Sequence, residues 1–130
     1  MHANTHFARW VFLLAGIVGI LEIAPLYFIE GVVNQTQPPA ITHPEFYYGF
    51  LGVALPWQVA FLIISRDPPR YLALLPALFL EKFLYPAAAF VLHLQGRLPP
   101  STLAVASLDL VWLVLFVISW AKLRSLTESQ

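Results

Sequence analysis

Four long apolar runs constrain this sequence more than any other feature. They cover residues 10–29, 46–65, 71–95 and 103–121. Each run is close to the ~20 residues that an α-helix needs to cross roughly 30 Å of hydrocarbon. Because backbone groups in lipid must satisfy their own hydrogen bonds, such runs indicate helices. We therefore expect an all-α fold, a four-transmembrane-helix antiparallel bundle with helices at about residues 8–30, 43–65, 68–95 and 102–123.

The composition agrees with a single transmembrane domain over residues 1–130. Hydrophobic residues make up 59% of the chain and charged residues 11%, which is far from the average of soluble proteins. Seven basic residues balance seven acidic ones, so there is no basic field that would select nucleic acid. The absence of cysteine excludes disulfides, thiolate metal sites and thiol nucleophiles. The lipid bilayer is the expected partner.

Local signals predict where the helices begin and end. Gly31 follows the first run, where a residue free to take positive φ can close a helix. The segment Thr42–Glu45 reads as a capping box with proline at the first helical position, so the second helix should begin there. We expect Asp67 and Ser101 to cap the third and fourth helices, and Gly96 to end the third. The polar connection after Gly31 is expected to be irregular.

The distribution of basic residues predicts the orientation. Arg97 lies alone on one side of the expected bundle, and five basic residues lie on the other. These five are Arg9, Arg66, Arg70, Lys122 and Arg124. Because cytoplasmic loops are enriched in Lys and Arg, both termini should be cytoplasmic.

Polar residues from all four runs fall near the same depth. Counting ~1.5 Å per residue from the ends of each run puts them within a few ångströms of the midplane. A charge there costs at least ~2.5 kcal/mol, so we expect these side chains to face one another inside the bundle. Lys82 should reach Asp109 or Glu22, or alternatively Glu81 should reach Gln58. The candidates for binding a ligand or a proton are Glu22, Gln58, Glu81, Lys82, Tyr85, Asp109 and Trp112.

The neighbours of these residues favour an interior position. Ala15 and Gly19 share a helical face with Glu22, so a second helix could approach this acid closely. In the fourth run a single stripe contains Thr102, Ala106, Asp109, Trp112 and Phe116. A proline frees the carbonyl four residues before it, so three prolines should expose acceptors beside the polar residues. These are Pro25, Pro56 and Pro86, which would free Leu21, Gly52 and Lys82.

A second polar cluster is expected at the outer end, with Glu30, His43, Glu45, His93 and Arg97. Imidazole and carboxylate groups are zinc ligands, which makes His43 and His93 the candidates for a metal. However, Glu45 is already explained by the helix cap, and no H-x-x-x-H or Glu-x-x-His spacing is present. We therefore predict no metal and no cofactor.

Several segments resemble small four-helix bacterial integral membrane proteins that carry no assigned activity. They are Pro44–Gln58, Ser65–Pro68, Leu80–Lys82 and Gln95–Arg97. The resemblance implies the fold and no mechanism. We expect the protein to be an integral protein of a bacterial inner membrane. In size and buried acids alone the chain is also similar to the four-helix sterol isomerase and sigma-2 receptor family. It lacks that family's acid within the second helix and long first loop, so no residue role is carried over.

The sequence leaves three classes of function open. The first is a binding or structural bundle, which could be a subunit of a larger membrane complex. The second is a proton-coupled carrier of small molecules, working as a homodimer, with Glu22 or Asp109 as the acid that takes up the proton. The third is an intramembrane, isomerase-like enzyme on a lipophilic substrate, with one carboxyl as acid and another as base. Among the acids we single out Glu22 as the functional group.

Overall fold

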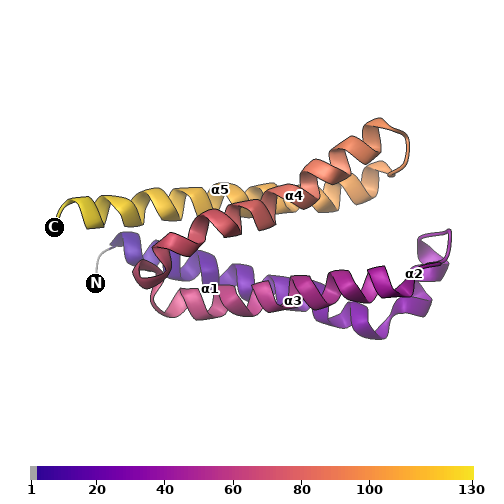
Figure 1. Ribbon diagram of the computed structural model, residues 1–130, viewed down its shortest axis with the longest axis horizontal. Helices are drawn as coiled ribbons and strands as arrows, with labels where there is room; N and C mark the ends of the chain where they lie inside the picture. The colour runs from indigo at the N-terminus through magenta and orange to yellow at the C-terminus, as the bar shows by residue number, and fades with distance from the viewer. Residues whose placement is uncertain (1–2) are drawn as a thin grey trace. The chain divides into compact units, whose positions relative to one another are not determined.

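The computed structural model describes residues 3–130, all of whose regular structure is helical (Figure 1). The elements in chain order are α1 (Ala3–Ile23), η1 (Ala24–Phe28, a 3₁₀ helix), α2 (Glu30–Thr36), α3 (Pro44–Arg66), η2 (Pro68–Leu74, also 3₁₀), α4 (Leu75–Leu94) and α5 (Pro100–Glu128). This confirms the predicted all-α class. Four helical stretches are long and apolar enough to cross a membrane, namely Ala3–Phe28, Pro44–Arg66, Pro68–Leu94 and Pro100–Glu128.

Two of the predicted helix boundaries agree with the structure. Helix α3 begins at Pro44, where the fixed φ of proline suits the first helical position. Helix α4 ends before Gly96, which has a φ of 71°. Its N–H donates to the carbonyl of His93 at 2.9 Å, and the N–H of Arg97 donates to the carbonyl of Leu92 at 2.8 Å. These bonds satisfy carbonyls that the end of the helix would leave unpaired.

Three predicted boundary signals are wrong. Gly31 does not end a helix but lies inside α2, and it has no positive φ. The connection expected to be irregular therefore contains a short helix. Neither Asp67 nor Ser101 caps a helix with its side chain, because the prolines that follow Asp67 and precede Ser101 start η2 and α5 instead. The first span starts earlier than predicted, at Ala3, although α1 itself ends at Ile23 and η1 continues the span to Phe28. Helix α5 is longer than predicted, because it begins at Pro100 and continues to Glu128.

The third apolar stretch begins differently from a regular α-helix. Pro68 and Pro69 lack the N–H groups of an α-helical turn, and η2 takes 3₁₀ geometry there. Tyr71 departs from helical geometry, with φ −105° and ψ 17°, so η2 and α4 meet at a kink. The prediction of one helix over residues 68–95 thus identified the span but missed its kink.

The chain forms two compact units, one of residues 12–66 and the other of residues up to Val11 together with Asp67–Gln130. In the first unit α1 and α3 approach closely at two glycines. A Cβ at Gly16 would come within 2.8 Å of the backbone oxygen of Gln58 and 2.6 Å of the Leu62 side chain. A Cβ at Gly19 would overlap the side chain of Gln58. Of the small residues singled out in the first run, Gly19 therefore lies at the close approach, and Gly16 adds a second point that the sequence analysis did not name.

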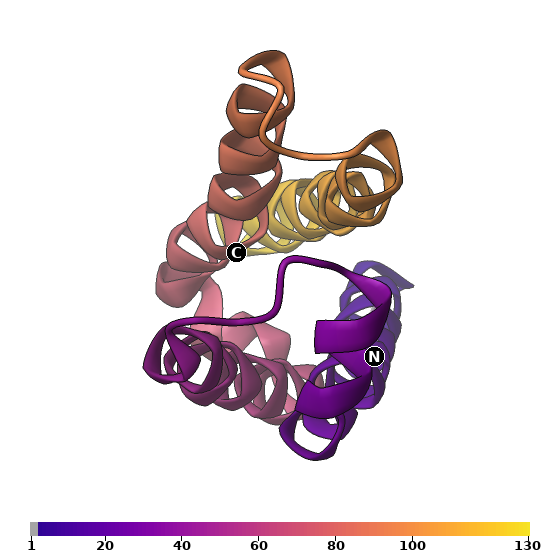
Figure 2. The ribbon, with the colours of Figure 1, turned by 90° about the vertical axis from the view of Figure 1, so that its right-hand side faces the viewer.

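In the second unit α4 and α5 run beside each other in opposite directions (Figures 1 and 2). The predicted stripe of α5 is its more buried face, because Ala106 and Phe116 are buried and the other members half-buried. Near the end of α5 the rings of Trp120 and of Phe79 of α4 form a T-shaped pair, with 6.0 Å between ring centroids. The Asn4 side chain donates to the Lys122 carbonyl at 3.4 Å, which holds the start of α1 against α5.

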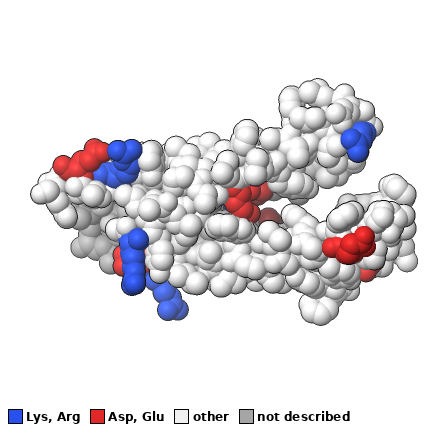
Figure 3. Space-filling view, viewed as in Figure 1, with Lys and Arg blue, Asp and Glu red and all other residues white. Residues whose placement is uncertain are grey.

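Large apolar side chains are exposed along all four candidate spans. Val53 of α3 is 67% exposed, Leu80 of α4 57% and Val114 of α5 56%. Most atoms on the face drawn in Figure 3 belong to uncharged residues. Such a surface is unfavourable in water and suits a surrounding of lipid, as expected for an integral membrane protein.

Candidate functional site

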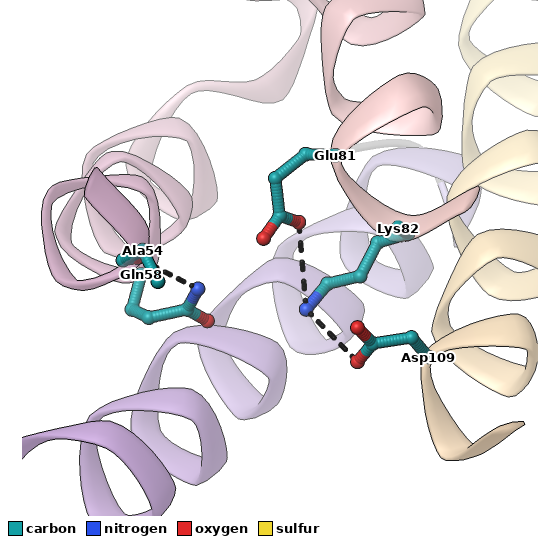
Figure 4. A network of polar contacts seen from close by, with 5 residues as sticks. All are labelled: Ala54, Gln58, Glu81, Lys82 and Asp109. Carbon is teal, nitrogen blue, oxygen red and sulfur yellow. Dashed lines mark hydrogen bonds and ion pairs between the residues drawn. The ribbon is translucent and has the colours of Figure 1, made fainter. Parts of the chain in front are cut away.

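The unit of α4 and α5 contains a charged triad of Glu81, Lys82 and Asp109. The ammonium of Lys82 lies 3.5 Å from the Asp109 carboxylate of α5 and 3.5 Å from the Glu81 carboxylate of its own helix. Figure 4 shows the ammonium between the two carboxylates. Of the two partners that the sequence left open for Lys82, Asp109 and Glu22, the structure shows the pair with Asp109.

The positions of the three residues in their helices explain this geometry. Glu81 and Lys82 are neighbours and start about 100° apart around α4, so they cannot point in the same direction. The long side chain of Lys82 bridges to α5, and the Glu81 carboxylate turns towards the same ammonium. Pro86, which is buried, has no N–H to donate to the Lys82 carbonyl. The polar side chains and a weakened helix turn therefore lie at the same level of α4.

Burial differs between the members of the triad. The Lys82 side chain is 6% exposed, whereas those of Glu81 and Asp109 are 18% and 23% exposed. Two carboxylates for one ammonium give the triad one negative charge in excess when all three groups are ionised. In a medium of low dielectric constant the ammonium stabilises both acids strongly, and its loss would leave them facing each other. The triad can therefore hold α4 to α5. The side chains of both acids are partly exposed, although the Oε2 atom of Glu81 is buried, so Asp109 is the acid that a further ligand could reach more easily.

Gln58 belongs to the other unit and is 3% exposed. Its side-chain Nε2 donates to the carbonyl of Ala54 at 3.0 Å (Figure 4). Its Oε1 is buried and accepts no hydrogen bond from any residue within 3–130. This oxygen fills the space that a Cβ at residue 19 would occupy beside Gly19. Gln58 thus serves the packing of α1 against α3.

The remaining candidates from the sequence are Glu22, Tyr85 and Trp112. Glu22 is exposed on the unit of residues 12–66, one residue before α1 ends and two before η1 begins. Pro25 lies in η1, so the predicted disturbance of the helix beside Glu22 takes the form of a change to 3₁₀ geometry. Tyr85 lies one turn after Lys82 on α4 and is 45% exposed, and Trp112 lies one turn after Asp109 and is half-buried.

The structure brings together Glu81, Lys82 and Asp109, and in the other unit it brings Gln58 to Gly19. The sequence analysis expected the polar side chains of all four spans to meet in one cluster. That Glu22 and Gln58 join the triad in such a cluster stays a prediction.

Both candidate metal ligands have local hydrogen-bonding partners. The Nδ1 atom of His43 lies 3.1 Å from the Glu45 carboxylate, and both side chains are exposed. The Nδ1 atom of His93 lies 2.9 Å from the carbonyl of Leu98, just past the end of α4. Within residues 3–130 no three His, Cys, Asp or Glu side chains gather in a way that could hold a metal ion.

The sequence did not reveal the polar contacts of the two adjacent tyrosines of α3. The hydroxyl of Tyr48 donates to the Glu30 carboxylate at 2.8 Å, and that of Tyr47 donates to the Leu26 carbonyl at 2.6 Å. The available signal was a Tyr-Tyr pair in the first turns of one run and an acid just past the end of the preceding run.

The triad, the Gln58 contact and the tyrosine contacts are thus the polar features that the geometry of this chain offers for a function. The triad joins two helices that are both candidate membrane spans. The other two features join neighbouring elements within the unit of residues 12–66. Comparison of the chain with family models, with curated proteins and with solved structures gives no match.

Proposed function

We propose that this chain is a small polytopic membrane protein of the structural or binding class, in which the charged triad fixes α4 against α5. The observation that carries the proposal is the Lys82 ammonium, 3.5 Å from a carboxylate of each helix. Charged groups at this position in an apolar span are costly unless they are paired, and here each is paired. The triad can hold α4 and α5 together by itself, so this role requires no bound ligand.

The proposal includes the arrangement in the membrane. The four spans form one antiparallel bundle in a bacterial inner membrane, with both termini in the cytoplasm. Support comes from the sequence, because the polar residues of all four spans lie at similar depth by residue counting. The five basic residues on one side against Arg97 on the other support the orientation. A larger complex or a homodimer would cover part of the exposed apolar surface.

Purification in mild detergent, followed by mass spectrometry of bound proteins and lipids, tests the class of function. A stoichiometric companion protein would support a structural subunit. Glu81→Gln is the matched variant, because it removes the excess charge and keeps the pair between Lys82 and Asp109. If the triad only holds the helices, the variant purifies with the same companions and the same thermal stability as the wild type. Aggregation of Glu81→Gln, or an unchanged stability of Lys82→Met, would contradict the proposal.

A second candidate is a proton-coupled carrier or an intramembrane enzyme on a lipophilic substrate. The observation in its favour is the second carboxylate of the triad, since one acid suffices to neutralise Lys82 and both acids are partly exposed. Such an acid could exchange a proton with a substrate or with water. This candidate predicts that a lipophilic compound bound to the purified wild type is lost from Glu81→Gln while the variant stays folded. Retention of the same compound by that variant would reject it.

A further inference from the structure

The segment between the first two spans has its polar groups turned inward. On α2, Glu30 accepts a hydrogen bond from Tyr48 at 2.8 Å. Asn34 accepts a hydrogen bond from the backbone N–H of Ile41 at 2.8 Å, which closes the loop after α2. In the middle of η1 the Leu26 carbonyl accepts a hydrogen bond from the Tyr47 hydroxyl at 2.6 Å. Helix α2 is therefore held in one orientation by the first turns of α3 and by its own loop.

The exposed side of η1, of the start of α2 and of the first turn of α3 carries large apolar side chains. Phe28 is 87% exposed, Val32 of α2 54% and Phe46, in the first turn of α3, 72%. Val32 and Gln35 lie on the same outward face of α2, one turn apart, so this face changes from apolar to polar along the helix. Glu30 is the one charged residue between residues 28 and 42, and its carboxylate is already bonded to Tyr48.

The position of the segment in the chain identifies what lies against this side. It connects the end of the candidate span Ala3–Phe28 to the start of the candidate span Pro44–Arg66, and Figure 2 shows the loop after α2 running across to α3. A segment at the ends of two spans lies at the boundary between hydrocarbon and water. Apolar side chains at that boundary are stabilised when they enter the zone between headgroups and acyl chains, about 5–10 Å deep.

We propose that η1 and α2 form an interfacial anchor, in which Phe28, Val32 and Phe46 enter the headgroup and acyl-chain boundary of the leaflet at this end of the protein. Tyr47 and Tyr48 are positioning residues that turn these side chains outward. The lipid requirement is apolar contact and not headgroup charge, because the segment presents no unbonded charged group between residues 28 and 42. The inference rests on the proposed insertion of the four spans.

The chain has no cysteine, so a single introduced cysteine can be labelled with an environment-sensitive fluorophore in the full-length protein. The test position is Val32→Cys, and the matched control is Gln35→Cys on the same face of α2. Val114→Cys, near the middle of α5 and 56% exposed, is the control for insertion. Each labelled protein is reconstituted into phosphatidylcholine vesicles that carry a nitroxide either near the headgroup or near the end of the acyl chain.

We expect the label at residue 32 to emit at shorter wavelength than the label at residue 35. It should also resist quenching by aqueous iodide, and the shallow nitroxide should quench it more than the deep one. The label at residue 114 should be quenched most by the deep nitroxide. Iodide access at residue 32 equal to that at residue 35 would overturn the inference. Shielding from both iodide and the lipid nitroxides would also overturn it, because protein would then cover the site.

The control at residue 114 separates the two proposals. If its label is quenched by the deep nitroxide and the label at residue 32 behaves as in water, the anchor is wrong and the membrane insertion stands. If no lipid nitroxide quenches residue 114, both proposals are rejected. Adding Tyr48→Phe to Val32→Cys should raise iodide access, since the hydroxyl that holds Glu30 is lost. If iodide access at residue 32 is unchanged, Tyr48 does not position this segment. Replacing part of the phosphatidylcholine by an anionic lipid should leave all results unchanged, because the proposed contact is apolar.

Discussion

The carboxamide of Gln58 occupies the space that a Cβ at Gly19 would need, so any side chain at residue 19 requires the Gln58 side chain to move. One turn earlier, Gly16 lies against the backbone oxygen of the same glutamine. A flexible side chain can move away from a new methyl group, whereas a helix backbone must shift as a whole. The two glycines should therefore differ in their tolerance of alanine.

We predict that Gly16→Ala destabilises the protein more than Gly19→Ala, within the ~1–3 kcal/mol typical of overpacked cores. Thermal unfolding in detergent measures the difference. Gly49→Ala is the control, because that glycine lies in α3 with nothing within 4 Å of an added Cβ, and alanine is the better helix former. Adding Gln58→Ala should restore stability to Gly19→Ala and not to Gly16→Ala. Equal melting temperatures for the two glycine variants would contradict the packing described.

Lys82→Met should destabilise the fold by roughly 3–5 kcal/mol if both carboxylates remain ionised, because the ammonium that compensates them is lost. Lys82→Met combined with Asp109→Asn should melt at a higher temperature than Lys82→Met alone, since one of the uncompensated acids is removed. Thermal unfolding of the two single variants and the double variant measures this coupling. A double variant that melts at or below Lys82→Met would show that the ion pair across α4 and α5 does not stabilise the protein.

The orientation can be checked by cysteine labelling in intact cells. Thr36→Cys should react with a membrane-impermeant thiol reagent, and Ser125→Cys should react only after the cells are opened. The reason is the excess of basic residues on the side of Ser125. The wild-type protein, which has no cysteine, is the control for nonspecific labelling. Reaction at residue 125 in intact cells, without reaction at residue 36, would reverse the proposed topology.

Glu22→Gln should leave the melting temperature close to that of the wild type, since exposed substitutions usually change stability by less than about 0.5 kcal/mol. Any compound that copurifies with the wild type through Glu22 should be lost from the folded variant. Leu21→Ala, at the neighbouring exposed residue, is the control for nonspecific effects on the end of α1. If Glu22→Gln retains the compound at the wild-type level, the prediction that Glu22 is the functional acid is wrong.

Much of the fold could be predicted because lipid imposes a simple rule on apolar runs. The four spans, the start of α3 at Pro44 and the end of α4 at Gly96 all follow from apolar length, proline and glycine. Equal depth and opposite charge predicted an acid partner for Lys82 but could not choose between Asp109 and Glu22, because both acids lie at similar depth. Helix α2 was missed because seven residues carry too little periodicity, and the bonds that hold it come from outside the helix, from Tyr48 of α3 and from the backbone N–H of Ile41 in the following loop. The predicted caps at Asp67 and Ser101 were wrong because η2 and α5 begin at prolines and have no side-chain cap.

Helix α5 has 29 residues and is therefore ~44 Å long at 1.5 Å per residue, well beyond the roughly 30 Å of hydrocarbon. If α5 stands close to the membrane normal, its last two turns extend into water while remaining helical. The ion pair between Arg124 and Glu128, at 3.1 Å, and the guanidinium of Arg124 4.8 Å from the Trp120 ring would stiffen this part. A spin label at Ser125 would then move with α5 as a rigid lever, so its distance from the bilayer surface would report the tilt of the whole helix.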